Sequence, residues 1–157
     1  MNIKLVCAAF GMVVALAVTA AAQPLRNAPM QVKVDGKMLS LSAEAWRDLM
    51  PIIVPDGATP PRGGRPLIAD LTLKTTDGQA LPKVKALAVT LFSAGRKWSG
   101  APGEVRRTAG ASSMEVLVRN GPKWAVGAKV DAVLTLRTPR GFTRSVRAPQ
   151  TTIQAVY

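Results

Sequence analysis

The feature that most constrains the fold is the alternation of apolar and polar residues in several short segments. In residues 67–75 (LIADLTLKT) the apolar positions are Leu67, Ala69, Leu71 and Leu73, and residues 129–137 (KVDAVLTLR) repeat the pattern from Val130 to Leu136. A period of two is that of a strand with one buried face. The same pattern predicts strands at residues 31–34, 38–47, 84–92, 112–119, 142–147 and 151–157, with inward residues that include Leu87, Val89, Leu91, Met114, Val116 and Val118.

Turn residues separate these segments. Asp35-Gly36 between two strand patterns predicts a type I′ hairpin, because both turn residues must adopt positive φ angles. Residues 42–50 (SAEAWRDLM) also allow a short helix capped by Ser42, although Ala45 stands where a capping box needs an acid. The Pro/Gly-rich segment 51–66 excludes regular structure and predicts a long surface connection, either functional or simply mobile.

Several short strands with regular turn signals favour an all-β fold, an antiparallel sandwich or barrel. Residues 67–157, with the run GPKWAVGAKVDAVLTL, resemble bacterial immunoglobulin-like or fibronectin-III-like domains of exported proteins. The resemblance implies an antiparallel immunoglobulin-like β-sandwich of about seven to nine strands. It implies an architecture and no activity, because this fold hosts many functions.

The N-terminal residues are typical of a secretory signal peptide. Lys4 precedes the apolar run LVCAAFGMVVALAV, and a small-residue ending predicts cleavage after Ala22. An uncleaved membrane anchor is the alternative. We therefore expect a signal peptide at residues 1–22 and one domain at residues 23–157. The mature chain would have no transmembrane segment and would be exported to the periplasm or the extracellular space.

The residues available for chemistry are few. The chain has no histidine, and its single cysteine, Cys7, lies in the predicted signal peptide. Ser-His and Cys-His nucleophiles and ordinary zinc or copper sites are thereby excluded from the mature chain. We expect no metal, no cofactor and no catalytic residue. A carboxylate pair such as Asp70 and Asp131 is the remaining enzymatic alternative, in a hydrolase.

Cations and tryptophans are the candidate binding residues. The net charge of +12 predicts salt-sensitive attraction to anionic surfaces. Trp98 with Arg96 and Lys97 predicts either an exposed stacking platform or a core residue, and Trp124 is expected to plug the core. Trp46 lies on the polar phase of its strand, where it could cover a sheet face beneath the loop. Residues 137–147 contain four arginines, which form a solvated face, protect an exposed sheet edge from pairing with another strand, or bind an anion. The tentative ligand-binding set is Trp98, Arg96, Lys97, Arg140 and Arg144.

These patterns predict a non-catalytic binding or scaffolding domain of the bacterial envelope. Its partner would be a protein or an anionic envelope component, and specific nucleic-acid binding is not expected, because no recognised motif accompanies the basic residues. Two alternatives stay open. One is a basic surface that binds anionic polymers or lipid head groups, and the other is the carboxylate hydrolase.

Overall fold

The structure is a computed structural model that describes residues 24–157. The predicted signal peptide, its cleavage after Ala22 and Cys7 lie outside the described residues. The described part is all-β and contains no α-helix. Its elements are the 3-10 turn η1 (Leu25–Asn27) and ten strands, β1 (Gln31–Val34), β2 (Lys37–Asp48), β3 (Leu67–Thr75), β4 (Lys85–Ser93), β5 (Arg96–Gly100), β6 (Glu104–Arg106), β7 (Ser113–Val118), β8 (Lys129–Arg137), β9 (Thr143–Arg147) and β10 (Thr151–Val156).

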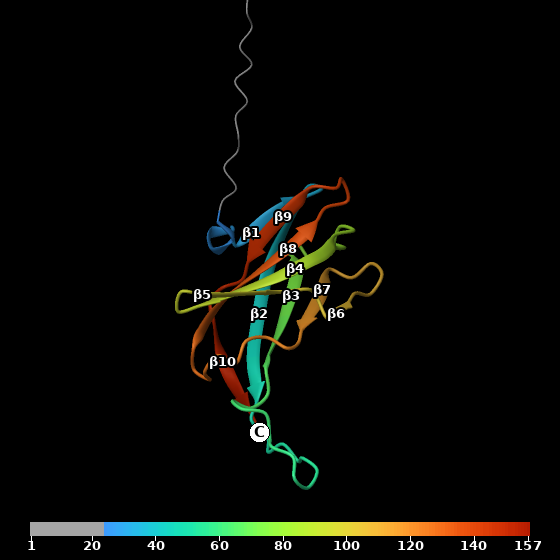
Figure 1. Cartoon of the computed structure of the whole chain (residues 1–157). Coiled ribbons are helices and arrows are strands. Elements are labelled where there is room, and N and C mark those ends of the chain that lie inside the picture. The colour runs from blue at the N-terminus through green and yellow to red at the C-terminus, as the bar shows by residue number, and fades with distance from the viewer. Residues whose placement is uncertain (1–23) are drawn as a thin grey trace, which may run out of the picture.

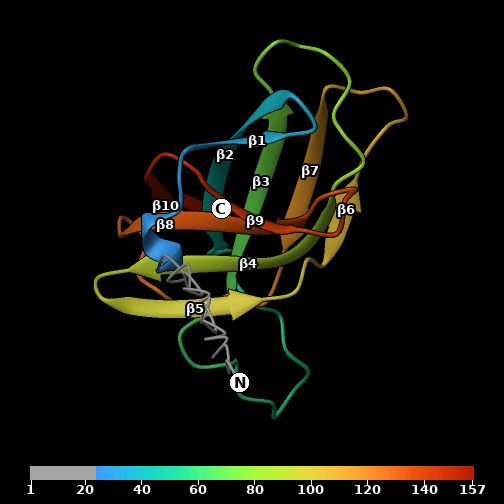
Figure 2. The same cartoon turned by 90° about the horizontal axis from the view of Figure 1, so that it is seen from above.

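The strands follow one open hydrogen-bonded path, β5-β4-β8-β10-β2-β3-β7-β6, with β1 added to β2 and β9 added to β8. Strand β10 connects the two parts of the path. Its first two residues pair antiparallel with β8, and residues Ile153–Val156 pair parallel with the end of β2. The β2, β3 and β7 strands lie in one layer, which the β4, β5, β8 and β9 strands cross in a second layer (Figures 1 and 2).

Two details of the predicted fold class need correction. The sheet is mixed, because β10 and β2 run parallel, and ten strands form where about seven to nine were expected. The carboxyl-terminal strand is brought alongside β2 by the crossover from one layer to the other, which no local pattern encodes.

The core lies between the two layers and consists of the inward residues of the alternating segments. Leu67, Leu71 and Leu73 of β3 are fully buried, as are Leu134 and Leu136 of β8. Trp124 is 5% exposed and belongs to the same apolar cluster, so its prediction as a core plug is confirmed.

The first hairpin and the long second strand form as predicted. Asp35 and Gly36 have φ angles of +47° and +80°, the positive values that a type I′ turn requires. Strand β2 runs from Lys37 to Asp48, so the helix considered for residues 42–50 does not form. Its inward residues Leu39, Leu41 and Ala45 are buried, and this burial favours the strand over the helix.

The predicted inward position of Leu87 is wrong. The register between β4 and β8 shifts between Ala86 and Ala88, which marks a β-bulge. A bulge adds one residue on one strand and changes which side chains face inward. Ala86 is therefore buried and Leu87 only partly so, whereas Val89 and Leu91 beyond the bulge are buried as predicted.

The Pro/Gly-rich connection at residues 51–66 contains no helix or strand and protrudes beyond the ends of β2 and β3 (Figure 1). A buried arginine anchors its end. Arg47 of β2 is 8% exposed and donates Nε to the carbonyl of Arg65 at 3.1 Å and Nη1 to that of Trp124 at 3.2 Å. Its Nη2 donates to the carbonyl of Gly63.

Candidate functional site

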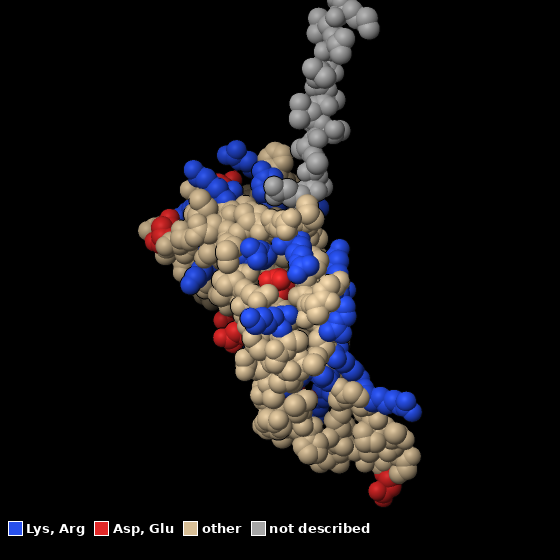
Figure 3. Space-filling model, turned by 90° about the vertical axis from the view of Figure 1, so that its left-hand side faces the viewer, with Lys and Arg blue, Asp and Glu red and all other residues tan. Residues whose placement is uncertain are grey.

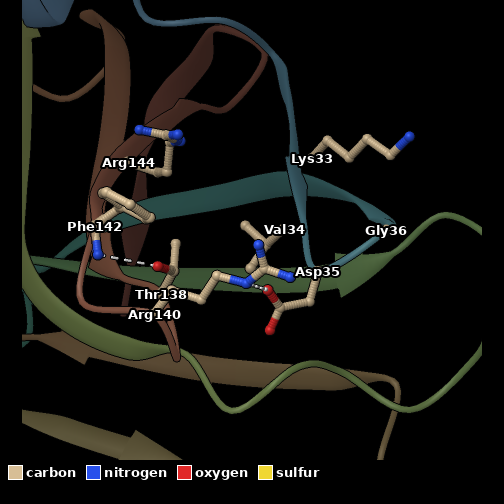
Figure 4. A pocket seen from close by; sticks show the side chains of 8 residues that line it. All are labelled: Lys33, Val34, Asp35, Gly36, Thr138, Arg140, Phe142 and Arg144. Carbon is tan, nitrogen blue, oxygen red and sulfur yellow. Dashed lines mark hydrogen bonds and ion pairs between the residues drawn. The ribbon is translucent and has the colours of Figure 1, made fainter.

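A hollow of about 230 Å³ lies where the β1–β2 turn meets the β8–β9 hairpin (Figure 4). The two turns are distant in the sequence, and strands β1 and β9 bring them together. The residues that line the hollow include three cations and one acid: Lys33, Val34, Asp35, Gly36, Thr138, Arg140, Phe142 and Arg144.

Hydrogen bonds around Thr138 hold the β8–β9 turn. The Thr138 amide donates to the carbonyl of Phe142 at 2.8 Å, and the Phe142 amide donates to Thr138 Oγ1 at 3.1 Å. Gly141 has a φ of +85°, and its amide donates to the Thr138 carbonyl at 2.9 Å. This closed turn projects Arg140 and Phe142 outward from a fixed backbone.

The positive charge of the hollow is only partly compensated. Arg140 Nε lies 3.5 Å from Asp35 Oδ1, with the arginine side chain 77% exposed. An ion pair this open to water contributes little stability. Arg144 lies against the exposed Phe142 ring, 5.7 Å from its centre, and Lys33 lies across the hollow from Arg144 (Figure 4). Three cations and one carboxylate thus line the hollow beside an exposed aromatic ring, and only Arg140 pairs with that carboxylate.

The other two arginines of this region do not line the hollow. Arg147 turns toward Asp131, with an Nη1–Oδ1 distance of 3.8 Å, and donates to the carbonyl of Ala28 at 3.4 Å. Arg137, at the end of β8, is exposed. The arginine-rich hairpin therefore divides into a cationic tip and a base that is part of the structure.

The predicted platform around Trp98 lies on a strand that the sequence patterns did not indicate. Trp98 is on β5, is half-buried and packs against the core. Its indole lies across Gly100, where any added Cβ would collide with the ring. Arg96 lies 5.3 Å from the ring centre of the buried Trp124, and Lys97 is exposed on the opposite face of β5.

The structure does not bring the predicted ligand-binding set into one site. β4 and β8 lie between β5 and β9 in the hydrogen-bonded order. Arg96 is opposite Ser93, near the end of β4 that pairs with Asp131, whereas Arg144 pairs with Leu136 near the other end of β8. Arg140 and Arg144 share the hollow, while Trp98, Arg96 and Lys97 lie elsewhere.

Sequence reasoning missed Lys33, Asp35 and Phe142 as parts of this site. Asp35 was identified as a turn residue, which it is, and Phe142 as part of a strand. Both turns carried a clear local signal. The contact between them depends on how the two layers pack, so no local signal could have joined them.

The two carboxylates considered for hydrolysis lie on opposite outer faces. Asp70 is on the outward phase of β3, whereas Asp131 is on the outward phase of β8 and pairs with Arg147. The core separates them, so they cannot flank one bond. Within residues 24–157, no group of three or more His, Cys, Asp or Glu side chains is arranged to hold a metal ion.

Lys and Arg side chains are spread over the face shown in Figure 3, where acidic side chains are few. No helix in residues 24–157 is long and apolar enough to cross a membrane. Neither a protein-family model nor a curated protein sequence matches this chain. A crystal structure of a Bordetella pertussis protein assigned the name ApaA is similar at a TM-score of 0.44 and 10% identity, over 82% of this chain and 97% of that one.

Proposed function

We propose that the protein is an exported, non-catalytic binding domain with an immunoglobulin-like sandwich architecture, and that it binds anionic groups at the cationic hollow. The observation that supports this function best is that Lys33, Arg140 and Arg144 line one hollow with a single carboxylate, Asp35. The phosphates or carboxylates of envelope polymers, or lipid head groups, are ligands of matching charge.

The chemistry of the hollow suits such groups. Guanidinium forks pair with the two oxygens of a phosphate or carboxylate, and the exposed Arg140 and Arg144 have most of their donors open. Phe142 is 58% exposed and adds an apolar contact beside them. The rest of the basic surface adds long-range attraction, which salt screens.

The test is the double variant Arg140→Glu/Arg144→Glu, measured by co-sedimentation with phosphatidylglycerol vesicles and by calorimetry with polyphosphate. Reversal of two contacting charges should weaken binding by at least about tenfold. Binding by the wild-type protein should also weaken steeply as NaCl is raised.

The matched control is Lys97→Glu/Lys129→Glu. It changes the net charge equally, and both lysines are exposed and lie outside the hollow, Lys97 on β5 and Lys129 at the start of β8. We expect this control to lose about twofold through long-range electrostatics alone. Equal losses in the two variants, or binding that NaCl does not weaken, would contradict a defined anion site.

A further inference from the structure

The outer face of β2, β3, β7 and β6 differs in charge from the rest of the molecule. Strand register places outward residues in rows across it. One row is Glu44, Asp70, Leu117 and Glu104, and the next is Ser42, Thr72, Glu115 and Arg106. Four of the nine acidic residues of a chain with net charge +12 are thus neighbours on one face.

Most carboxylates of this acidic face have no cationic partner among the described residues. Glu104 pairs with Arg106 at 2.8 Å, but in residues 24–157 no Lys or Arg lies within ion-pairing distance of Glu44, Asp70 or Glu115. Glu44 and Asp70 stand directly opposite each other, a position in which like charges destabilise a sheet.

Asp70 is the least satisfied of these groups. Its Oδ1 is shielded from solvent and has no hydrogen-bond partner. Burial raises the pKa of its carboxyl, the carboxylates of Glu115 and Glu44 raise this pKa further, and Arg106 lowers it in part. Asp70 lines a hollow of about 230 Å³ with Ser42, Glu44 and Thr72.

An aromatic groove adjoins this hollow. Trp46 lies two residues beyond Glu44 on the same face of β2, half-buried, with Gln154 of β10 on one side and Ile68 of β3 on the other. The groove around it measures about 540 Å³, a size that suits a ligand side chain. Its lining is Glu44, Ala45, Trp46, Thr151, Gln154 and Val156. Glu44 belongs to both depressions, so they form one continuous surface.

We propose that this surface docks a basic segment of a partner protein. A lysine or arginine side chain of that segment lies along the Trp46 indole, and its charge sits between Glu44 and Asp70. The cation gains from the face of the indole and from two carboxylates that have no counter-ion of their own.

Charge complementarity identifies this occupant. An anionic partner would add to the repulsion that already exists between Glu44 and Asp70. The net positive charge of the whole chain does not prevent a cation from binding, because charges beyond a Debye length of about 8 Å at physiological salt are largely screened. The local acidic face therefore decides the sign of the partner.

The experiment is calorimetric titration with an acetylated and amidated tetra-arginine peptide at physiological salt, where the net charge of the chain is screened, and it uses polyphosphate as the second ligand. The variant Glu44→Gln/Asp70→Asn should weaken tetra-arginine binding by about tenfold and leave polyphosphate binding intact. Trp46→Leu should weaken tetra-arginine binding by about threefold, through loss of the cation–π contact.

The matched control is Asp56→Asn/Asp77→Asn, which removes two exposed acids elsewhere on the chain and should leave tetra-arginine binding within about twofold. Arg140→Glu/Arg144→Glu should likewise retain it, which separates this surface from the anion site. Absence of tetra-arginine binding, or equal losses in the control and in Glu44→Gln/Asp70→Asn, would overturn the proposal.

Discussion

Arginines at the two ends of the molecule differ in burial and in hydrogen bonding. Arg47, at the end where the 51–66 connection leaves β2, is buried and donates to three backbone carbonyls. Arg140 and Arg144, at the end with the β1–β2 turn, are exposed, and the carboxylate of Asp35 pairs with Arg140 alone. The same side chain is structural in the first environment and available to a ligand in the second.

The difference lies in where the guanidinium donors go. Burial of a charge is tolerated when its donors have hydrogen-bond acceptors. Arg47 donates to the carbonyls of Gly63 and Arg65 in the connection and to that of Trp124 in the core, and so it links the two. An exposed guanidinium with open donors is solvated by water that an anion can replace. Residue type alone does not distinguish these roles.

The largest effect should come from Arg47→Met. This variant keeps apolar volume but leaves three buried or partly buried carbonyls without their donor, so the free energy of unfolding should fall by about 3 kcal/mol. Urea denaturation measures the loss. Anion binding at the cationic hollow should persist while the protein stays folded.

The matched substitution at the other end is Arg140→Met, which should change stability by less than about 0.5 kcal/mol because the side chain is exposed. Similar losses in the two variants would break the comparison, since they would show that both arginines support the fold.

An intermediate effect is expected for Asp70→Asn, which tests the converse case of a carboxylate without a cation. The folded-state pKa of Asp70 is raised above its unfolded value, so ionisation opposes folding above the folded pKa. Removal of the charge should therefore stabilise the protein at neutral pH, by roughly 0.5 kcal/mol given the like-charged neighbour.

This gain should disappear as the pH falls below the ordinary pKa of an aspartate, because the wild-type carboxyl is then protonated in both states. Urea unfolding at a series of pH values checks the trend. A variant that is less stable than wild type at neutral pH would show that the charged form of Asp70 supports the fold.

The smallest effect is expected for Asp35→Asn. An asparagine accepts the positive φ of this position and keeps the type I′ turn, while the partial neutralisation of Arg140 is lost. Affinity for polyphosphate should rise by about twofold, within the range of an exposed ion pair. Titration calorimetry measures the change, and a weaker affinity would mean that Asp35 positions Arg140 for the ligand.

Local patterns predicted most of the strands correctly. Alternation identified β3, β7, β8 and the long β2, because each of these strands buries one face in the core. Alternation failed at Leu87, where a bulge shifts the phase. It also missed β5 and β6, which are short edge strands with little buried apolar surface.

The candidate sites were predicted less well than the strands. Arg140 and Arg144 were identified by their density in the sequence, but their partners Lys33 and Asp35 come from a hairpin more than 100 residues away. The acidic face was missed for the same reason. Glu44, Asp70 and Glu115 stand singly in the sequence and become neighbours only through the registers of β2, β3 and β7.

The sequence by itself determined the all-β class, the inward side chains of most strands, the Asp-Gly hairpin and the burial of Trp124. These properties depend on a residue and its near neighbours, because the period of two assigns each side chain to the core or to solvent. The tertiary structure decided the parallel pairing of β10, the bulge in β4, the burial of Arg47 and the charge of each outer face. These depend on which distant strands lie side by side, and such pairing is selected by packing of the whole core.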